Sequence, residues 1–184
     1  MAIIPIFIPH AGCPHQCVFC NQKTISGQQT ASAAAVQQQI ERYLQWIRPG
    51  LSNEAAFYGG SFTGLPAALQ TELFQPVDEL LAKGIIGSVR LSTRPDYIDA
   101  ARLELLKGHG VKIVELGVQS LDDTVLAAAG RGHQAAEVGR AVALLKQYGF
   151  EACLQLMVGM PGQSFASVRD TVEQVLRLRP AIAR

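Results

Sequence analysis

Short apolar runs alternate with longer amphipathic stretches along most of the chain, and this alternation limits the possible folds more than any other feature. The apolar runs predict strands at residues 3–8, 54–58, 88–92, 112–117 and 152–158. The intervening stretches predict helices at 32–47, 65–83, 96–107, 135–148 and 164–178. Ser120 to Asp123 resembles a capping box that opens a further short helix. Because strand–helix units joined by short loops form parallel sheets with right-handed crossovers, we expect an α/β fold.

Two α/β architectures fit this order of elements, a doubly wound sheet and a curved barrel. The chain has 184 residues, whereas a complete (β/α)8 barrel needs about 250. Residues 179–184 resemble a helix exit followed by the first residues of another strand. We therefore expect residues 1–184 to form a single core domain that is truncated near its sixth strand.

The unusual residues of the sequence follow the predicted strands. They are the cysteines at 13, 17 and 20, Gly59-Gly60, Thr93-Arg94-Pro95, Gln119-Ser120 and Gly159-Met160-Pro161-Gly162. The carboxyl ends of parallel strands meet at one edge of the sheet, where both architectures place their ligands. We expect the functional site at that edge.

The three cysteines form a C-x3-C-x2-C motif. Thiolates are soft ligands that suit zinc, copper(I) and iron–sulfur clusters. A structural zinc site needs a fourth ligand, and the sequence has no second closely spaced cysteine pair to supply it. The remaining candidates are His10, His15 and Cys153. Three cysteines can instead hold three irons of a four-iron cluster and leave the fourth iron open. Cys153 lies in a predicted strand and is more typical of a small buried apolar residue.

Composition bounds the partners and the compartment. A formal net charge of +1 gives no basic footprint, so nucleic-acid binding would need a local patch or a further segment. The apolar run at the amino terminus contains Pro5 and is too short for a signal peptide, and no stretch approaches a membrane span. Four cysteines in 184 residues do not form a disulfide framework, and in a reducing compartment clustered cysteines are typical of metal ligands or catalytic groups. We expect a cytoplasmic protein with no membrane contact.

With these motifs the chain resembles the radical SAM superfamily, and within it most closely the elongator protein three-like group. The anaerobic coproporphyrinogen oxidase-like proteins are the next closest. The resemblance rests on the cysteine motif with an aromatic residue, Phe19, before its last cysteine, and on four further stretches in order. These are Gly59–Thr63, Ser92–Tyr97, Glu115–Ser120 and Arg131–His133. It implies a partial (β/α)6 TIM-type barrel of parallel strands.

The resemblance implies two cofactors, a [4Fe-4S] cluster and S-adenosylmethionine (SAM). One electron from a reductant such as flavodoxin or ferredoxin would cleave SAM and release a 5′-deoxyadenosyl radical that takes a hydrogen atom from the substrate. The substrate could be a tRNA or a small molecule such as a porphyrin. A zinc-stabilised, non-catalytic α/β binding module is the alternative.

Residue roles follow from the same resemblance. The cluster ligands would be Cys13, Cys17 and Cys20. Gly59 and Gly60 match a glycine pair whose missing Cβ atoms let the backbone approach the methionine amino group. Ser61 replaces a frequent Glu at the next position, which leaves the backbone carbonyls to hold that group. The glycine pair also fits a plain strand-to-loop turn.

Five further residues would complete the cofactor site. Ser92 could bond to the ribose, and Gln119 aligns with a glutamine that contacts the ribose in the related oxidases. Arg131 would face the methionine carboxylate, which suits a bidentate guanidinium. Met160 would supply an apolar wall beside the adenine, and Phe19 could pack against the adenine or the cluster. Each position also fits an ordinary role in a cap, turn or core.

Other residues near these motifs stay open at this point. Arg94 could pair with a carboxylate or a substrate phosphate, or form an ordinary ion pair of the barrel. His133 is most typical of a satisfied loop histidine, and Gln155 stands where the oxidases carry an acidic group. Candidate substrate contacts are Asn21, Gln22 and Lys23. Tyr58 and Tyr97 are candidates for the substrate pocket or a radical relay, although aromatic residues that flank strands usually pack.

Overall fold

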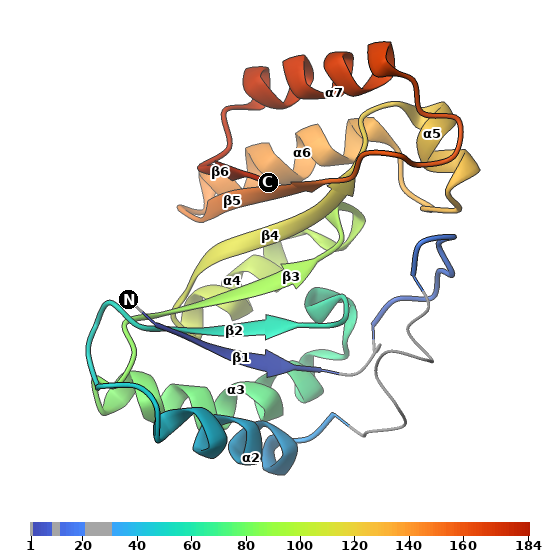
Figure 1. Cartoon of the computed structure of the whole chain (residues 1–184). Helices are drawn as coiled ribbons and strands as arrows, with labels where there is room; N and C mark the ends of the chain where they lie inside the picture. The colour runs from blue at the N-terminus through green and yellow to red at the C-terminus, as the bar shows by residue number, and fades with distance from the viewer. Residues whose placement is uncertain (1, 9–11, 21–30) are drawn as a thin grey trace.

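A computed structural model describes residues 2–8, 12–20 and 31–184, and it contains one curved parallel sheet (Figure 1). Its strands pair in chain order, β1-β2-β3-β4-β5-β6. Their bounds are Ile3–Phe7, Glu54–Tyr58, Ser88–Thr93, Val111–Gln119, Glu151–Leu156 and Ile182–Ala183. All five pairings are parallel, so every carboxyl end lies at the same edge. The predicted partial barrel of parallel strands is confirmed.

The helices cover the outer side of this sheet (Figure 1). They are α2 (Ala33–Leu44), α3 (Ala67–Ala82), α4 (Ala100–Gly108), α5 (Asp123–Ala128), α6 (Ala135–Gln147) and α7 (Phe165–Leu178). Two 3-10 turns, η1 (Phe62–Gly64) and η2 (Pro95–Tyr97), follow β2 and β3. No helix in the described part of the chain is long and apolar enough to cross a membrane.

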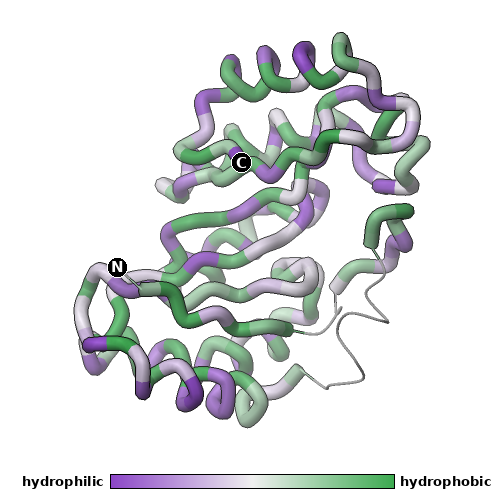
Figure 2. The backbone as a smooth tube through the Cα atoms, viewed as in Figure 1, coloured by the Kyte–Doolittle hydropathy of each residue, from purple (hydrophilic) through white to green (hydrophobic). Residues whose placement is uncertain are grey.

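A single large apolar core joins the strands to the helices. Figure 2 shows the green, apolar stretches along the strands and purple, polar turns on the outer helices. The centre of this core includes Phe57, Phe62 and Phe74, whose rings lie 4.7–5.5 Å apart. Aromatic packing of this kind adds to the stability gained by burying apolar area.

Two predicted helix starts are wrong. The helix predicted from Asp96 begins at Ala100, because Pro95–Tyr97 form a 3-10 turn and the Asp99 carboxylate caps α4 by accepting from the Arg102 N–H at 2.9 Å. The short helix predicted to open at Ser120 is capped instead by Asp122, which accepts from the Thr124 N–H at 2.9 Å. Both helices therefore start later in the sequence than predicted, each after an aspartate N-cap.

The remaining elements match the prediction to within a few residues. β4 is longer than predicted and carries a register shift between Gly117 and Gln119. Such a bulge re-aims the end of a strand. The strand expected after residue 179 is present as the two-residue β6.

Candidate active site

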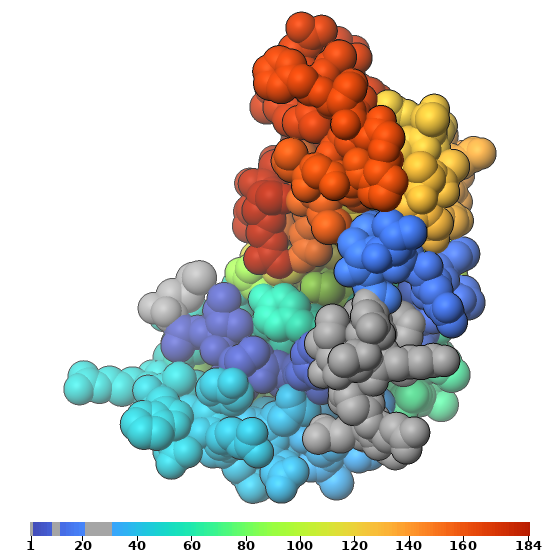
Figure 3. Space-filling model, turned by 45° about the vertical axis from the view of Figure 1, so that its right-hand side comes forward, coloured from blue at the N-terminus to red at the C-terminus, as the bar shows by residue number. Residues whose placement is uncertain are grey.

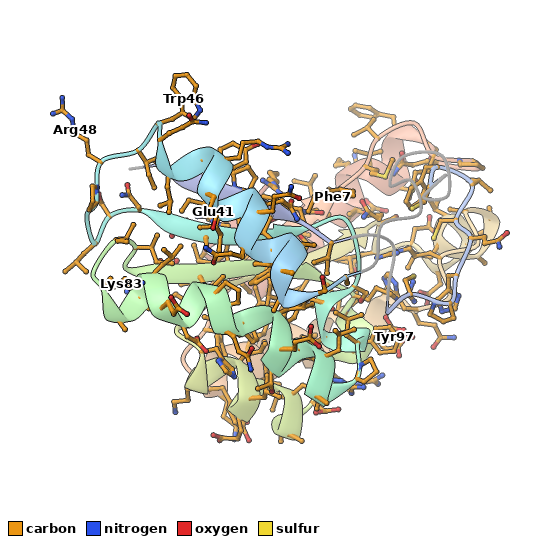
Figure 4. All side chains as sticks on the ribbon, turned by 90° about the horizontal axis from the view of Figure 1, so that it is seen from below. Phe7, Glu41, Trp46, Arg48, Lys83 and Tyr97 are labelled. Carbon is orange, nitrogen blue, oxygen red and sulfur yellow. The ribbon has the colours of Figure 1, made fainter. Side chains whose placement is uncertain are left out.

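A pocket of about 310 Å³ opens at the carboxyl ends of the strands. It lies at the end of the molecule that carries the 12–20 loop and, in Figure 4, Tyr97, whereas Trp46 and Arg48 mark the opposite end. The pocket is lined by Cys13, Phe19, Cys20, Tyr58, Gly59, Gly60, Ser61, Ser92, Thr93, Arg94, Gly117, Gln119, Arg131 and Gln155. All but two of the predicted site residues, Cys17 and Met160, are in this lining. The volume falls at the low end of the range of small-molecule sites.

The cysteine loop (residues 12–20) packs against the α5 side of the pocket. Figure 3 shows it, in blue, against the yellow and orange segments of α5 and the β5–α7 connection. The Val18 N–H donates to the Ala129 carbonyl at 3.1 Å, and the Cys20 N–H donates to the Cys17 carbonyl at 2.9 Å. Cys13 and Cys20 line the pocket, whereas Cys17 is buried behind it.

Arg131 joins the cysteine loop to the end of β4. One guanidinium nitrogen donates to the Gly117 carbonyl and another to the Cys17 sulfur at 3.8 Å. A Cβ on Gly117 would lie 2.8 Å from this guanidinium, so any larger residue would force the Arg131 side chain to shift. The buried Nε of Arg131 has no hydrogen-bond partner among the described residues. Burial, and next the charge of Arg94, lower the pKa of Arg131. The pocket therefore contains a buried cation with an unused donor.

Arg94 is the second buried cation of the site. Its side chain forms a bidentate ion pair with Asp96, and it also donates to the Arg131 carbonyl at 2.8 Å and to the Cys13 sulfur at 3.9 Å. The ion-pair alternative for Arg94 is thus the one that the structure contains. Burial opposes the charge of Arg94, but the hydrogen bond and charge of Asp96 outweigh it and raise its pKa.

The glycine pair after β2 is held by close contacts to β1. Gly59 has a φ of +95°, and a Cβ there would lie 2.5 Å from both the Phe7 ring and the Ile8 carbonyl oxygen. Glycine is therefore required by the backbone itself. The hydroxyl of Ser61 shares a 3.0 Å hydrogen bond with Thr93 and accepts from the Arg94 N–H, so it ties this loop to β3.

Gln119 ends β4 in a left-handed conformation with a φ of +70°. Its carbonyl accepts from the Met157 N–H at 2.9 Å, which fixes the turn beside β5. A non-glycine residue with positive φ is strained by about 1–3 kcal/mol, and such strain gathers at functional sites. The structure supplies this signal, which the sequence pattern did not carry.

Glu115 is a site residue to which the sequence analysis assigned no role. It is fully buried, and its carboxylate accepts hydrogen bonds from two pocket-lining side chains, Ser92 at 3.4 Å and Gln155 at 2.9 Å. Arg90 and Arg184 also contact it. The available signal was a charged residue inside an otherwise apolar strand, Val111–Gln119.

Several candidates lie away from the pocket lining. Met160 is buried with Val125 and Ala129 in a small apolar cluster against which Phe19 packs, so its contact with adenine stays a prediction. His133 is buried, and burial followed by the charges of Arg131 and Arg94 lowers its pKa to about 3.

The two tyrosines differ. Tyr58 lines the pocket, and burial raises its pKa. Tyr97 does not line it, and its ring instead contacts the guanidinium groups of Arg94 and Arg102, whose carbons lie 5.8 and 5.7 Å from the ring centre. The predicted substrate contacts Asn21, Gln22 and Lys23, and the zinc candidate His10, lie outside the described residues.

The described residues do not form a site for a single metal ion. Within 2–8, 12–20 and 31–184, no three Cys, His, Asp or Glu side chains are grouped so that they could hold one metal ion. Cys153 is buried in β5. His15 packs instead against Gly132, where an added Cβ would lie 2.2 Å from its ring. Neither residue therefore supplies the fourth ligand that a zinc site would need.

Comparison with known families decides the assignment, because the family model of the radical SAM superfamily matches residues 7–175. The chain belongs to the radical SAM superfamily. The resemblance inferred from the cysteine, glycine and Gln/Arg motifs is confirmed, and the protein is assigned to the enzymes of this superfamily. The radical SAM family implies a [4Fe-4S] cluster and SAM.

The similar proteins carry names that indicate different functions. The heme chaperone HemW of Bacillus subtilis is 29% identical over 90% of this radical SAM chain and 45% of its own length. The tRNA uridine(34) acetyltransferase of Methanocaldococcus infernus is 26% identical over 95% of this chain and 40% of its own length. A solved structure of HemN of Escherichia coli, a coproporphyrinogen III oxidase and radical SAM enzyme, matches with a TM-score of 0.72 and 21% identity. The match covers 97% of this chain and 42% of the HemN chain. The chain spans about half the length of the curated relatives it matches.

Proposed function

We propose that this chain is the core of a radical SAM enzyme, in which Cys13, Cys17 and Cys20 hold a [4Fe-4S] cluster and the adjoining pocket binds SAM. The observation that carries the proposal is the unpartnered, buried Nε of Arg131 in a pocket that two of these cysteines line. A buried cation with an unused donor is favourable only if an anionic group binds to it. The carboxylate of SAM is such a group.

The residues of the pocket fit the cofactors in charge and in shape. Soft sulfur ligands suit an iron–sulfur cluster. Arg94 and Arg131 are buried near Cys13 and Cys17, so they offset the negative charge of thiolates and a carboxylate. Gly59, Gly60 and Ser61 leave a side of the pocket without large side chains, where backbone carbonyls would hold the methionine ammonium group.

The chain's own contribution is to bind, orient and exclude water. Ser92 and Gln119 would contact the ribose from the ends of β3 and β4, and Phe19, backed by the cluster that contains Met160, would cover the adenine. When bound, the cluster and SAM would supply a 5′-deoxyadenosyl radical for hydrogen abstraction. The apolar wall and the packed barrel interior would keep water away from it.

Modification of tRNA is the substrate class that we favour for the whole protein, with a reductant such as flavodoxin or ferredoxin as its electron donor. It is supported by the Methanocaldococcus infernus relative, whose name includes tRNA uridine(34). The formal charge of +1 gives this core no broad basic surface. Recognition of tRNA would therefore depend on a local patch or on another part of the protein.

Anaerobic reconstitution with iron and sulfide tests the proposal. Wild-type protein should bind about four irons per chain, and added SAM should change the EPR spectrum of the reduced cluster. C13A, C17A and C20A should each lose most of the iron while remaining folded. C153A is the matched control, since Cys153 is buried in β5, and it should retain the iron.

A colourless wild-type protein that binds one zinc ion would contradict the proposal. So would a C13A variant that fails to fold without any metal, because a structural site is coupled to folding. The Arg131 contact is tested separately by R131Q, which should bind SAM at least tenfold more weakly, as measured by equilibrium dialysis.

A further inference from the structure

Arg94 is held in one place by three contacts. Its Nε and one terminal nitrogen donate to the two carboxylate oxygens of Asp96, at 2.9 and 3.0 Å. The guanidinium carbon lies 5.8 Å from the centre of the Tyr97 ring. Only 2% of the residue is exposed. A bidentate pair backed by an aromatic ring fixes both the position and the plane of a guanidinium.

The remaining terminal nitrogen of Arg94 faces the cysteine loop. It donates to the Cys13 sulfur at 3.9 Å and to the Arg131 carbonyl at 2.8 Å. Arg131 in turn contacts the Cys17 sulfur at 3.8 Å. One side chain therefore joins the end of β3, the cysteine loop and the α5–α6 connection. With all three nitrogens engaged, Arg94 is poorly placed to recognise a substrate.

We propose that Arg94 is a positioning residue that fixes Cys13 and the Arg131 backbone, and that its charge raises the reduction potential of the cluster. This role rests on the proposed function, since it acts through the cluster that the cysteines would hold. A hydrogen bond and a positive charge beside a cluster sulfur favour the reduced, more negative state. Asp96 orients Arg94, while its own charge acts in the opposite direction.

Arg102 provides a matched control within the same segment. It also pairs with an aspartate, Asp99, and its guanidinium carbon lies 5.7 Å from the centre of the Tyr97 ring. It contacts the Thr63 carbonyl at 2.7 Å and none of the cysteines. R102Q therefore removes a guanidinium with the same kinds of partner, although a more exposed one, without removing the contact to Cys13.

The first experiment measures retention of the reconstituted cluster. R94Q and R94K should release iron to a chelator several-fold faster than wild type, because neither side chain can span Asp96, Cys13 and the Arg131 carbonyl together. R102Q should release iron at the wild-type rate. If R94Q takes up no cluster while its apo form melts like apo R102Q, the positioning role is supported.

The second experiment separates charge from structure through an EPR-monitored redox titration. R94Q should lower the equilibrium constant for cluster reduction about tenfold, which corresponds to a potential about 59 mV more negative for a one-electron couple. R94K keeps the charge and should change the potential less. D96N removes a negative charge and should leave the potential unchanged or raise it, the opposite sign to R94Q.

The outcomes separate this inference from the proposed function. R94Q with wild-type iron retention and potential would overturn the role of Arg94 and leave the cluster assignment intact. Equal shifts in R94Q and D96N would show that loop disorder, and not the charge of Arg94, sets the potential. Wild-type protein that takes up no iron would overturn the cluster assignment itself, and this role with it.

Discussion

At the scale of single residues, the backbone conformation that places the Gln119 side chain costs the protein stability. Its φ of +70° is strained for any residue but glycine. We expect Q119G to be about as stable as wild type, because relief of strain offsets the flexibility that glycine adds to the unfolded chain. Q119V removes the same amide and adds strain, because a β-branched residue is an outlier at positive φ, so it should lose about 1–2 kcal/mol of stability in urea unfolding. Equal stability of the two variants would show that the turn relaxes.

His133 makes stability depend on pH. Its pKa is lowered from the usual 6.5 to about 3, first by burial and then by the charges of Arg131 and Arg94. Below pH 6.5 the unfolded chain takes up a proton on His133, whereas the folded chain does not. The free energy of unfolding therefore has its full value above pH 6.5 and falls as the pH decreases toward 3. The expected contribution is up to about 1.4 kcal/mol per pH unit.

Denaturant unfolding between pH 7 and pH 5 measures this dependence, and H133Q is the matched variant because it cannot take up the proton. H133Q should show a flatter decline than wild type over that interval. Parallel curves for the two proteins would mean that His133 is protonated in the folded state.

At the scale of elements, helix starts show what local sequence can and cannot specify. The helix predicted at 164–178 starts where expected, because its N-cap, Ser164, uses only its own helix: the Ser164 hydroxyl accepts from the Ser167 N–H at 3.1 Å. The helix predicted from Asp96 does not, because Asp96 is used by Arg94 and the chain forms a 3-10 turn first. The local sequence pattern does not reveal that another side chain will pair with a potential capping residue.

The capping box of α7 gives a prediction at this scale. Ser164 and Ser167 exchange hydrogen bonds at 3.1 and 3.0 Å between side chain and backbone. S164A should cost about 1 kcal/mol of stability, the usual value for losing an N-cap. S167A loses only the reciprocal bond and should cost less, as measured by urea unfolding. A larger loss in S167A would reassign the dominant cap.

At the scale of the whole molecule, strand order and the site's edge followed from the sequence, because parallel strands bring all their carboxyl ends together. The cysteines, Gly59 and Gln119 could thus be grouped from the sequence, whereas Arg131 was added by the resemblance to the radical SAM superfamily. Contacts across the sheet could not be predicted in this way. Glu115 meets Arg90 only because β3 and β4 pair in one register, and Arg94 meets Cys13 only because the 12–20 loop folds back on β3.

A substitution at Glu115 measures how much this cross-sheet network contributes to the free energy of unfolding. Its fully buried carboxylate accepts from Arg90 on β3 at 3.3 Å and from Gln155 on β5 at 2.9 Å. E115Q leaves Arg90 paired with Glu54, so no buried charge loses its only partner, and the cost should be about 1–3 kcal/mol, the usual value for a hydrogen bond to a charged group. The exposed Glu79–Lys83 pair is the control, since E79Q should cost less than about 1 kcal/mol. If E115Q and E79Q lose equal free energy of unfolding, the buried carboxylate adds nothing to the backbone pairing and apolar packing of the strands, and Glu115 serves only to orient Ser92 and Gln155 at the pocket.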